Sequence, residues 1–97
     1  MNFELVSTEF FLSQIKDLSN KYKKQVRNKL ELIKQNPFRF KNIHSKKFSK
    51  VFRVRMNIEG KEVRLIYAVV GTKIIIAGLL DRSKEYRDLE NYLSKIE

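Results

Sequence analysis

Hydrophobic and polar residues alternate along two stretches in the second half of the chain, which is the pattern of strands with one buried face, and a third stretch that is mostly apolar follows them. The stretches cover residues 51–58, 62–70 and 73–80. Two short connections that contain glycine separate them, Gly60–Lys61 and Gly71–Thr72. Both fit two-residue turns of type II′, which place glycine first. The pattern therefore predicts an antiparallel meander of three strands.

In the first half of the chain, apolar residues recur at every third or fourth position, which indicates helix. Ser7 or Thr8 can serve as the N-cap of this pattern. Ser19 and Asn20 are poor helix formers in its middle, so two antiparallel helices are favoured over one long helix. Pro37 prevents the second helix from continuing. The apolar positions are Phe11, Ile15, Leu18, Tyr22, Val26, Leu30 and Ile33.

Three further segments complete the predicted order. Residues 2–7 alternate and read as a first strand, residues 38–50 form a basic connector, and residues after Asp81 have the spacing of a terminal helix. The order β-α-α-β-β-β-α predicts an α+β protein in which a helical hairpin packs on an antiparallel sheet. The 97 residues suit one domain spanning 1–97.

Charge is distributed unevenly along the chain, whose formal net charge is +10. Between Lys16 and Arg55 there are 14 basic and two acidic residues, so the whole excess lies in this stretch. Such an excess favours a polyanionic partner, a nucleic acid or an acidic protein. The alternative is a lysine-rich surface that serves only solubility.

Several classes are excluded or disfavoured by composition. No apolar run approaches the roughly 18 residues of a membrane helix, and the N-terminus lacks the pattern of a secretory signal. Cysteine is absent, so disulfides and thiolate metal sites are excluded. His44 is the single histidine, which argues against a transition-metal site. We expect a cytoplasmic protein without metal, cofactor or membrane contact.

The arginines of the predicted strands gather on one face. A turn at Gly60–Lys61 turns the apolar residues of both strands to one side and makes Arg55 and Arg64 diagonal neighbours, roughly 7 to 8 Å apart. Arg53 lies on the same face. These residues could serve only to keep the outer face of the hairpin soluble. Alternatively, they could bind an anion, because converging cations repel each other and a bound anion relieves the repulsion.

The second predicted turn extends this face. A loop at Gly71–Thr72 places Glu62 beside Asp81, so that Arg82 and then Tyr86 emerge near Arg64. Arg82 could instead pair with a neighbouring glutamate, and Tyr86 could be ordinary packing of the last helix. Otherwise, three arginines and a tyrosine from separate segments share one concave edge.

The chain resembles the RelE/ParE superfamily of toxins from bacterial and archaeal toxin–antitoxin pairs. The segments "FRVRM" (52–56), "VRLIYAV" (63–69) and "DRSKEY" (81–86) carry the resemblance, which spans nearly the whole chain. It implies a RelE-like fold and a small basic toxin that an acidic antitoxin holds inactive. RelE-like members cleave messenger RNA in the ribosomal A site, whereas ParE-like members poison DNA gyrase.

The resemblance also implies roles for single residues. Arg53 and Arg55 match the two basic residues of the RelE-type central strand, Arg64 matches the arginine at the scissile phosphate, and Tyr86 and Arg82 match the C-terminal pair. The implied catalytic residues are therefore Arg55, Arg64, Arg82 and Tyr86. The implied RNA-binding residues, which would contact mRNA and ribosomal RNA, are Arg53, Lys46, Lys47, Lys50, Arg39 and Lys41.

The implied chemistry is metal-independent: the 2′-hydroxyl of RNA attacks its own phosphorus, and arginines stabilise the added negative charge. Arginine stays protonated and does not readily act as a base, so the general acid and base stay unassigned. Two alternatives stay open. One is a ParE-like gyrase inhibitor, and the other is a degenerate relative that only binds an antitoxin or RNA.

Overall fold

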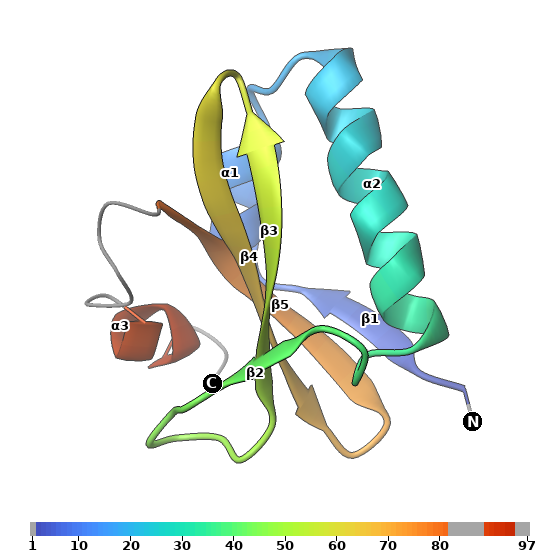
Figure 1. Cartoon of the computed structure of the whole chain (residues 1–97), viewed down its shortest axis with the longest axis vertical. Coiled ribbons are helices and arrows are strands. Elements are labelled where there is room, and N and C mark those ends of the chain that lie inside the picture. The colour runs from blue at the N-terminus through green and yellow to red at the C-terminus, as the bar shows by residue number, and fades with distance from the viewer. Residues whose placement is uncertain (1, 82–88, 95–97) are drawn as a thin grey trace.

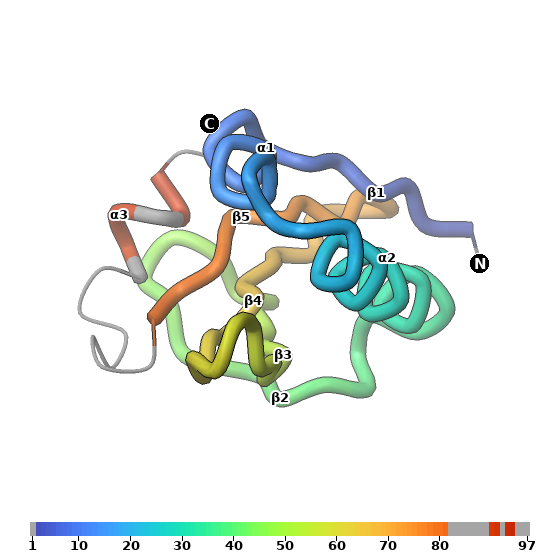
Figure 2. Tube along the Cα trace, turned by 90° about the horizontal axis from the view of Figure 1, so that it is seen from above, coloured from blue at the N-terminus to red at the C-terminus, as the bar shows by residue number. Residues whose placement is uncertain are grey.

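Five strands form one sheet with helices on both of its faces (Figure 1). The structure is a computed structural model that describes residues 2–81 and 89–94. Figure 2 shows α1 and α2 on one side of the sheet and α3 on the other. The expected α+β class is confirmed. In chain order the elements are β1 (Glu4–Ser7), α1 (Glu9–Ile15), α2 (Asn20–Gln35), β2 (Lys41–Ile43), β3 (Val51–Ile58), β4 (Lys61–Val70), β5 (Lys73–Asp81) and α3 (Leu89–Ser94).

The helical hairpin begins and breaks where its polar residues predict. The Thr8 hydroxyl caps α1 by accepting a hydrogen bond from the Phe11 N–H at 3.1 Å. Ser19 is the N-cap of α2, and this helix ends at Gln35, two residues before Pro37. No helix in the described ranges is long and apolar enough to cross a membrane.

The sheet differs from the expected one at both of its edges. Its order is β1-β5-β4-β3-β2, and β1 runs parallel to β5, so the sheet is mixed. The intervening elements carry the chain back to the starting end, as a parallel pair requires. The added edge strand β2 comes from the basic connector and is only three residues long. Its alternation is too short to be recognised in the sequence.

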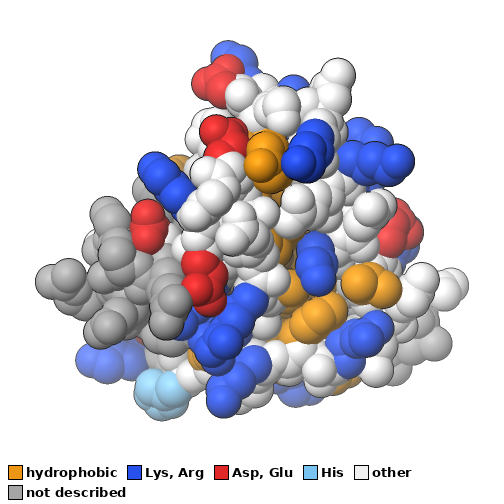
Figure 3. Space-filling view, turned by 45° about the horizontal axis from the view of Figure 1, so that its top comes forward, with side chains coloured by type: hydrophobic (Ala, Val, Ile, Leu, Met, Phe, Trp, Pro, Cys, Tyr) orange, Lys and Arg blue, Asp and Glu red, His pale blue; other side chains and the backbone are white. Residues whose placement is uncertain are grey.

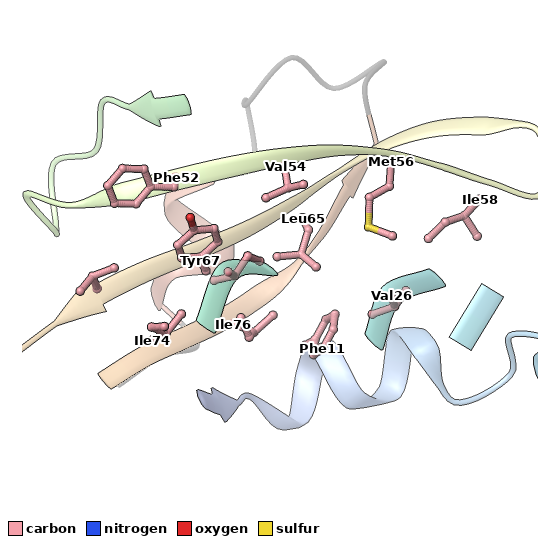
Figure 4. Close-up of a cluster of buried hydrophobic side chains, with 12 residues drawn as sticks. Phe11, Val26, Phe52, Val54, Met56, Ile58, Leu65, Tyr67, Ile74 and Ile76 are labelled. Atoms are coloured by element: carbon pink, nitrogen blue, oxygen red, sulfur yellow. The ribbon is translucent and has the colours of Figure 1, made fainter. Parts of the chain in front are cut away.

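The face of the sheet under α1 and α2 carries the main core. Every second residue of β3 and β4 points into it, as Figure 4 shows for Phe52, Val54, Leu65 and Tyr67. The Tyr67 hydroxyl donates a hydrogen bond to the Pro37 carbonyl at 2.5 Å, which anchors the segment after α2 to this core.

The turn between β3 and β4 differs from the predicted one. Glu59 and Gly60 form the loop, with φ of 54° and 80°, which is the type I′ pattern and not type II′. Each residue of β3 therefore faces a β4 residue two positions earlier than predicted. A shift of two keeps every side chain on its predicted face, because side chains alternate with period two. It does move Arg55 directly opposite Arg64.

The pairing of β4 with β5 matches the prediction only near the turn. Val70 faces Lys73 as expected, but a bulge between Ile66 and Tyr67 shifts the rest of the ladder by one residue. Asp81 consequently faces Val63 and not Glu62, so the predicted neighbour was wrong.

Gly78 lies at this bulge, against α1. A Cβ atom at Gly78 would lie 2.8 Å from the Gln14 Oε1 atom and 3.1 Å from the Phe10 ring. Gln14 also bonds to both backbone groups of Leu79, at 2.8 and 2.6 Å. The bulge thus accompanies a close approach of α1 that periodicity alone does not reveal.

A second, smaller core covers part of the opposite face of the sheet. The sequence predicts that Arg53, Arg55 and Arg64 share this face. The structure also buries residues of β3, β4 and β5 there with Leu93 of α3, while Ile43 and Phe48 of the connector pack against them. The buried members are Val51, Ile66, Ala68, Ala77, Leu80 and Leu93.

Candidate nucleic-acid interface

The arginines of β3 stand at odd-numbered positions, and these positions point away from the main core. The Val69 N–H donates a hydrogen bond to the Lys50 carbonyl at 2.9 Å. With the register of β3 and β4, this bond means that the even-numbered residues of β3 form the hydrogen-bonded pairs with β4. Odd-numbered residues are then non-hydrogen-bonded partners in this pair of strands. Arg53 is half-buried and Arg55 is exposed, both on the face opposite α1 and α2.

Arg55 and Arg64 form a like-charge pair directly across β3 and β4. In a non-hydrogen-bonded pair the Cα atoms lie about 4.5 Å apart and the side chains are closer than elsewhere in a sheet. Like charges in this position destabilise a sheet. The structure therefore brings these two predicted site residues closer than the diagonal placement expected from the sequence.

Arg64 is the inner member of the pair. The residue is only 9% exposed, and its Nε atom is buried. Ile66 lies beside it along β4 and Leu80 lies directly opposite on β5, both fully buried. Apolar neighbours on two sides restrict the aliphatic part of the Arg64 side chain, which lies at the end of the second core.

A second like-charge pair lies two residues away along β3, where Arg53 faces Lys41 of β2. The alternation of β4 also places one acidic residue on this face, Glu62, two residues before Arg64. Among the described residues of these three adjacent strands, four cations thus share the surface with one carboxylate. Figure 3 shows Lys and Arg side chains grouped in the lower half of one side of the molecule, with hydrophobic side chains between them.

Lys46 and Lys47 lie in a loop that α3 organises. The Glu90 carboxylate of α3 accepts hydrogen bonds from the Ser45 hydroxyl at 3.1 Å and the Lys46 N–H at 3.2 Å. The Ser45 hydroxyl in turn accepts from the Lys47 N–H at 3.1 Å. Both lysine side chains are exposed. Glu90 was missed in the sequence because its only signal is a carboxylate in a helix remote from this loop.

Of the other predicted RNA-binding residues, Arg39 lies between α2 and β2 and Lys50 directly precedes β3, and the cation of each is near an aromatic ring. The Lys50 ammonium is 5.4 Å from the centre of the Phe38 ring, and the Arg39 guanidinium is 5.3 Å from that of Phe40. The six predicted RNA-binding residues therefore fall into separate groups, with Arg39 and Lys50 beside rings that pack on the main core.

Two predicted catalytic residues, Arg82 and Tyr86, lie outside the described residues, directly after β5 ends at Asp81. Tyr67 is not a candidate for the role predicted for Tyr86. It points into the main core, and burial raises the pKa of its hydroxyl. The Tyr67 hydroxyl therefore stays protonated, and it lies on the face of the sheet opposite to that of Arg55 and Arg64.

Two hollows lined by described residues lie away from the arginines. One, of about 520 Å³, lies between the N-terminal segment and the end of α2, at Asn2, Phe3, Glu31, Lys34 and Gln35. The other, of about 250 Å³, is lined by Leu18, Ile58, Glu59, Lys61, Val63 and Leu79. Neither is lined by the paired arginines, so the expected hollow between them is not one of these two.

Comparison with solved structures identifies the fold. A variant of the E. coli toxin RelE in the free state superposes with a TM-score of 0.71 at 16% identity, covering 98% of this chain and 97% of that one. A chain of the intact E. coli RelBE toxin–antitoxin complex gives a TM-score of 0.64 at 17% identity, covering 84% of this chain and 96% of that one. The isolated E. coli RelE toxin gives 0.62 at 18%, over 96% and 99%. No protein-family model and no curated protein sequence matches.

Proposed function

Because this chain has a RelE-like toxin fold, we propose that it is the toxin of a toxin–antitoxin pair and a ribosome-dependent mRNA endoribonuclease. Residues 1–97 would act as one toxin domain in the cytoplasm, with mRNA and ribosomal RNA of the A site as partners. The observation that carries the proposal is the direct opposition of Arg55 and Arg64 on a non-hydrogen-bonded strand pair.

This opposition suits a phosphate that gains charge. Each guanidinium offers forked donors that match phosphate oxygens. Two of them held by adjacent rigid strands can bind two oxygens of the same phosphate without reorganising during the reaction. The mutual repulsion of the pair is relieved when the anion binds, and most of all in the transition state, where the phosphorane carries the larger negative charge.

The proposed reaction needs no oxidant and no added nucleophile. The ribose 2′-oxygen bonds to the adjacent phosphorus, the bond from phosphorus to the 5′-oxygen breaks, and the hydroxyl proton ultimately reaches the leaving 5′-oxygen. The products are a 2′,3′-cyclic phosphate and a 5′-hydroxyl end. Arg55 and Arg64 would stabilise the phosphorane, and Arg82 and Tyr86 are assigned to the same site on the sequence resemblance.

The partner in the RelBE structure motivates the second half of the proposal. We assign to this chain a cognate antitoxin with an acidic segment. The four cations Lys41, Arg53, Arg55 and Arg64 give such a segment a complementary surface. An antitoxin bound there would occupy the phosphate site directly.

The test is induction of the protein in cells, followed by mapping of mRNA 5′ ends. We expect new 5′ ends inside translated codons. Arg55→Ala should lower the cleavage rate about 100-fold or more, the usual cost of losing one donor to a transition-state oxyanion. Because Arg55 is exposed, this variant should stay folded. Lys73→Thr, which removes an exposed cation at the far end of β5, is the matched control and should cleave normally.

Other outcomes assign other functions. Intact messages together with broken or relaxed chromosomes would indicate gyrase as the target. Intact messages and no growth arrest, with a stable antitoxin complex, would indicate a relative that has lost catalysis. Either result would overturn the ribonuclease proposal.

A further inference from the structure

Phe38 is a large aromatic side chain left 46% exposed beside the end of α2. Leu12 and Val70 are exposed to a similar degree, at 49% and 45%, but they are aliphatic. Single exposed apolar side chains are common and need no explanation. Phe38 differs because neighbouring rings hold it in place and the Lys50 ammonium lies over it.

The turn that carries Phe38 is fixed at three points. The Phe38 N–H donates to the Asn36 Oδ1 atom at 3.1 Å, and the Arg39 N–H donates to the Asn36 carbonyl at 3.3 Å. Pro37 is buried, and its carbonyl accepts the 2.5 Å hydrogen bond from Tyr67. The exposed ring is therefore part of a preordered turn, and a ligand would not have to order it on binding.

Aromatic neighbours hold the ring from the protein side. The centre of the Phe38 ring lies 5.8 Å from that of Phe3 and 5.9 Å from that of Phe52, with the planes at 74° and 70°. Phe52 in turn stacks on Tyr67, with centres 5.4 Å apart. These near-perpendicular contacts are favourable, and they tie an exposed ring to the main core.

Cations approach this ring and its neighbours. Lys50 lies over Phe38 and Arg39 over Phe40, both within cation–π range. The 520 Å³ hollow adjoins the ring through Phe3, and it is lined by one cation, Lys34, and one acid, Glu31. A flat apolar surface among cations is the arrangement with which proteins bind single-stranded nucleic acids, stacking the base and pairing the phosphate.

The Phe38 ring is also linked to the arginine face through its contact with β3. Phe52, which contacts Phe38, precedes Arg53 on β3, and Arg55 follows about 10 Å further along the strand. Phe52 and Arg53 point to opposite faces of the sheet near the short edge strand β2. A single strand of RNA bound at Arg55 and Arg64 can thus run past Arg53 and Lys41, cross the edge of the sheet at β2 and reach Phe38.

We propose that Phe38 is a stacking platform for a base of single-stranded RNA, with Lys50 and Arg39 binding the neighbouring phosphates. The site lies beyond the bond that is cut and would hold a flanking nucleotide. This inference rests on the proposed function, because it takes RNA as the ligand. A flat ring with cations at its side favours a base over an acidic peptide, whose apolar side chains need a groove.

The chain contains no tryptophan, so Phe38→Trp introduces a single fluorophore at the proposed platform. The probe is a short 2′-O-methyl oligoribonucleotide, which cannot be cleaved, and its twin with abasic sites, which carries the same phosphates. We expect the base-bearing probe to quench the fluorescence and the abasic twin to leave it largely unchanged. Equal quenching by both probes would overturn the proposal.

Affinity gives a second readout. Phe38→Ala should weaken binding of the base-bearing probe about 5- to 150-fold, the measured range for one stacked base, and Phe38→Tyr should restore it. Leu12→Ala, which removes an equally exposed side chain on α1, is the control and should bind as the wild type does. A thermal melt checks that each variant is folded. Unchanged affinity in folded Phe38→Ala would overturn the proposal.

Two further arms separate the possible failures. If Arg55→Ala weakens RNA binding but Phe38→Ala does not, the platform is wrong and the proposed function stands. If the wild type does not bind the oligoribonucleotide even at low salt, the RNA-directed function fails with it. If an acidic peptide quenches Phe38→Trp and RNA does not, the surface is a protein-docking site and the platform is overturned.

Discussion

The two faces of the sheet are formed by the same alternation of residues along the strands, but their side chains differ in composition. Under α1 and α2, the inward residues of β3, such as Val54 and Met56, are apolar and nearly all buried. On the opposite face, the small second core occupies one part, while Arg53, Arg55 and Arg64 occupy the rest. One face is built for stability, whereas the other combines burial with charge that costs stability.

Leu65 and Ile66 provide the most direct test of this difference, because these neighbours on β4 are both fully buried but point to opposite faces. Leu65→Ala should lower the free energy of unfolding by about 2–5 kcal/mol, the usual range for a core leucine. Ile66→Ala should fall at the lower end of that range, since the smaller cluster has fewer fixed neighbours and can collapse into the space. Urea unfolding measures both. A larger loss for Ile66→Ala would show that the second core is the more rigid one.

The buried hydroxyl of Tyr67 gives the main core a distinctive response to alkaline pH. Burial raises the pKa of this group in the folded protein, whereas in the unfolded chain the hydroxyl titrates near the ordinary tyrosine pKa of 10.0. Above that pH the unfolded state loses the proton first, so the folded state becomes progressively less stable. The expected slope from this group is about 1.4 kcal/mol per pH unit.

Tyr67→Phe should lack this contribution and should also lose the hydrogen bond to Pro37, about 1 kcal/mol at neutral pH. The difference in unfolding free energy between wild type and variant should therefore narrow above pH 10. A constant difference across this range would contradict the burial of the hydroxyl.

On the arginine face the expected effect on stability is smaller and opposite in sign. Arg55→Thr removes one member of a like-charge pair and places a good strand former there, so the protein should gain about 0.2–1 kcal/mol. The gain should shrink as salt is added. Lys73→Thr is the matched control, because Lys73 faces Glu4 across β1 and β5, and its loss should not stabilise. A loss of stability in Arg55→Thr would mean that the pair is not repulsive.

Much of this comparison could be predicted from the sequence, because faces follow from period-two alternation and survive errors of register. The turn between β3 and β4 was misplaced, since Glu59 adopts a positive φ that is unusual for a residue with a side chain. The shift of two residues left Arg55 and Arg64 on one face but moved them from diagonal to directly opposite.

Other features depend on contacts between distant segments and leave little trace in local pattern. The bulge opposite Tyr67 accompanies the approach of α1 to Gly78, and it made the predicted neighbour of Asp81 wrong by one residue. The second core includes Leu93 of α3. The helical spacing of Leu93 is the same for either face of the sheet, so the sequence does not reveal which face α3 covers. The prediction was therefore right that Arg53, Arg55 and Arg64 share one face and incomplete about what covers that face. That these residues form a catalytic site stays a prediction. Arg82 and Tyr86 remain predictions.

The central claim is that the opposed arginines of β3 and β4 bind a ribose phosphate. The most direct measurement is the thermal midpoint of wild type, Arg55→Ala and Lys73→Thr with and without a nucleoside 2′,3′-cyclic phosphate, the product of the proposed reaction. We predict that the ligand raises the midpoint of wild type and of Lys73→Thr, because it binds only the folded state, and leaves that of Arg55→Ala unchanged. An equal rise in all three proteins, or none in the wild type, would contradict the claim.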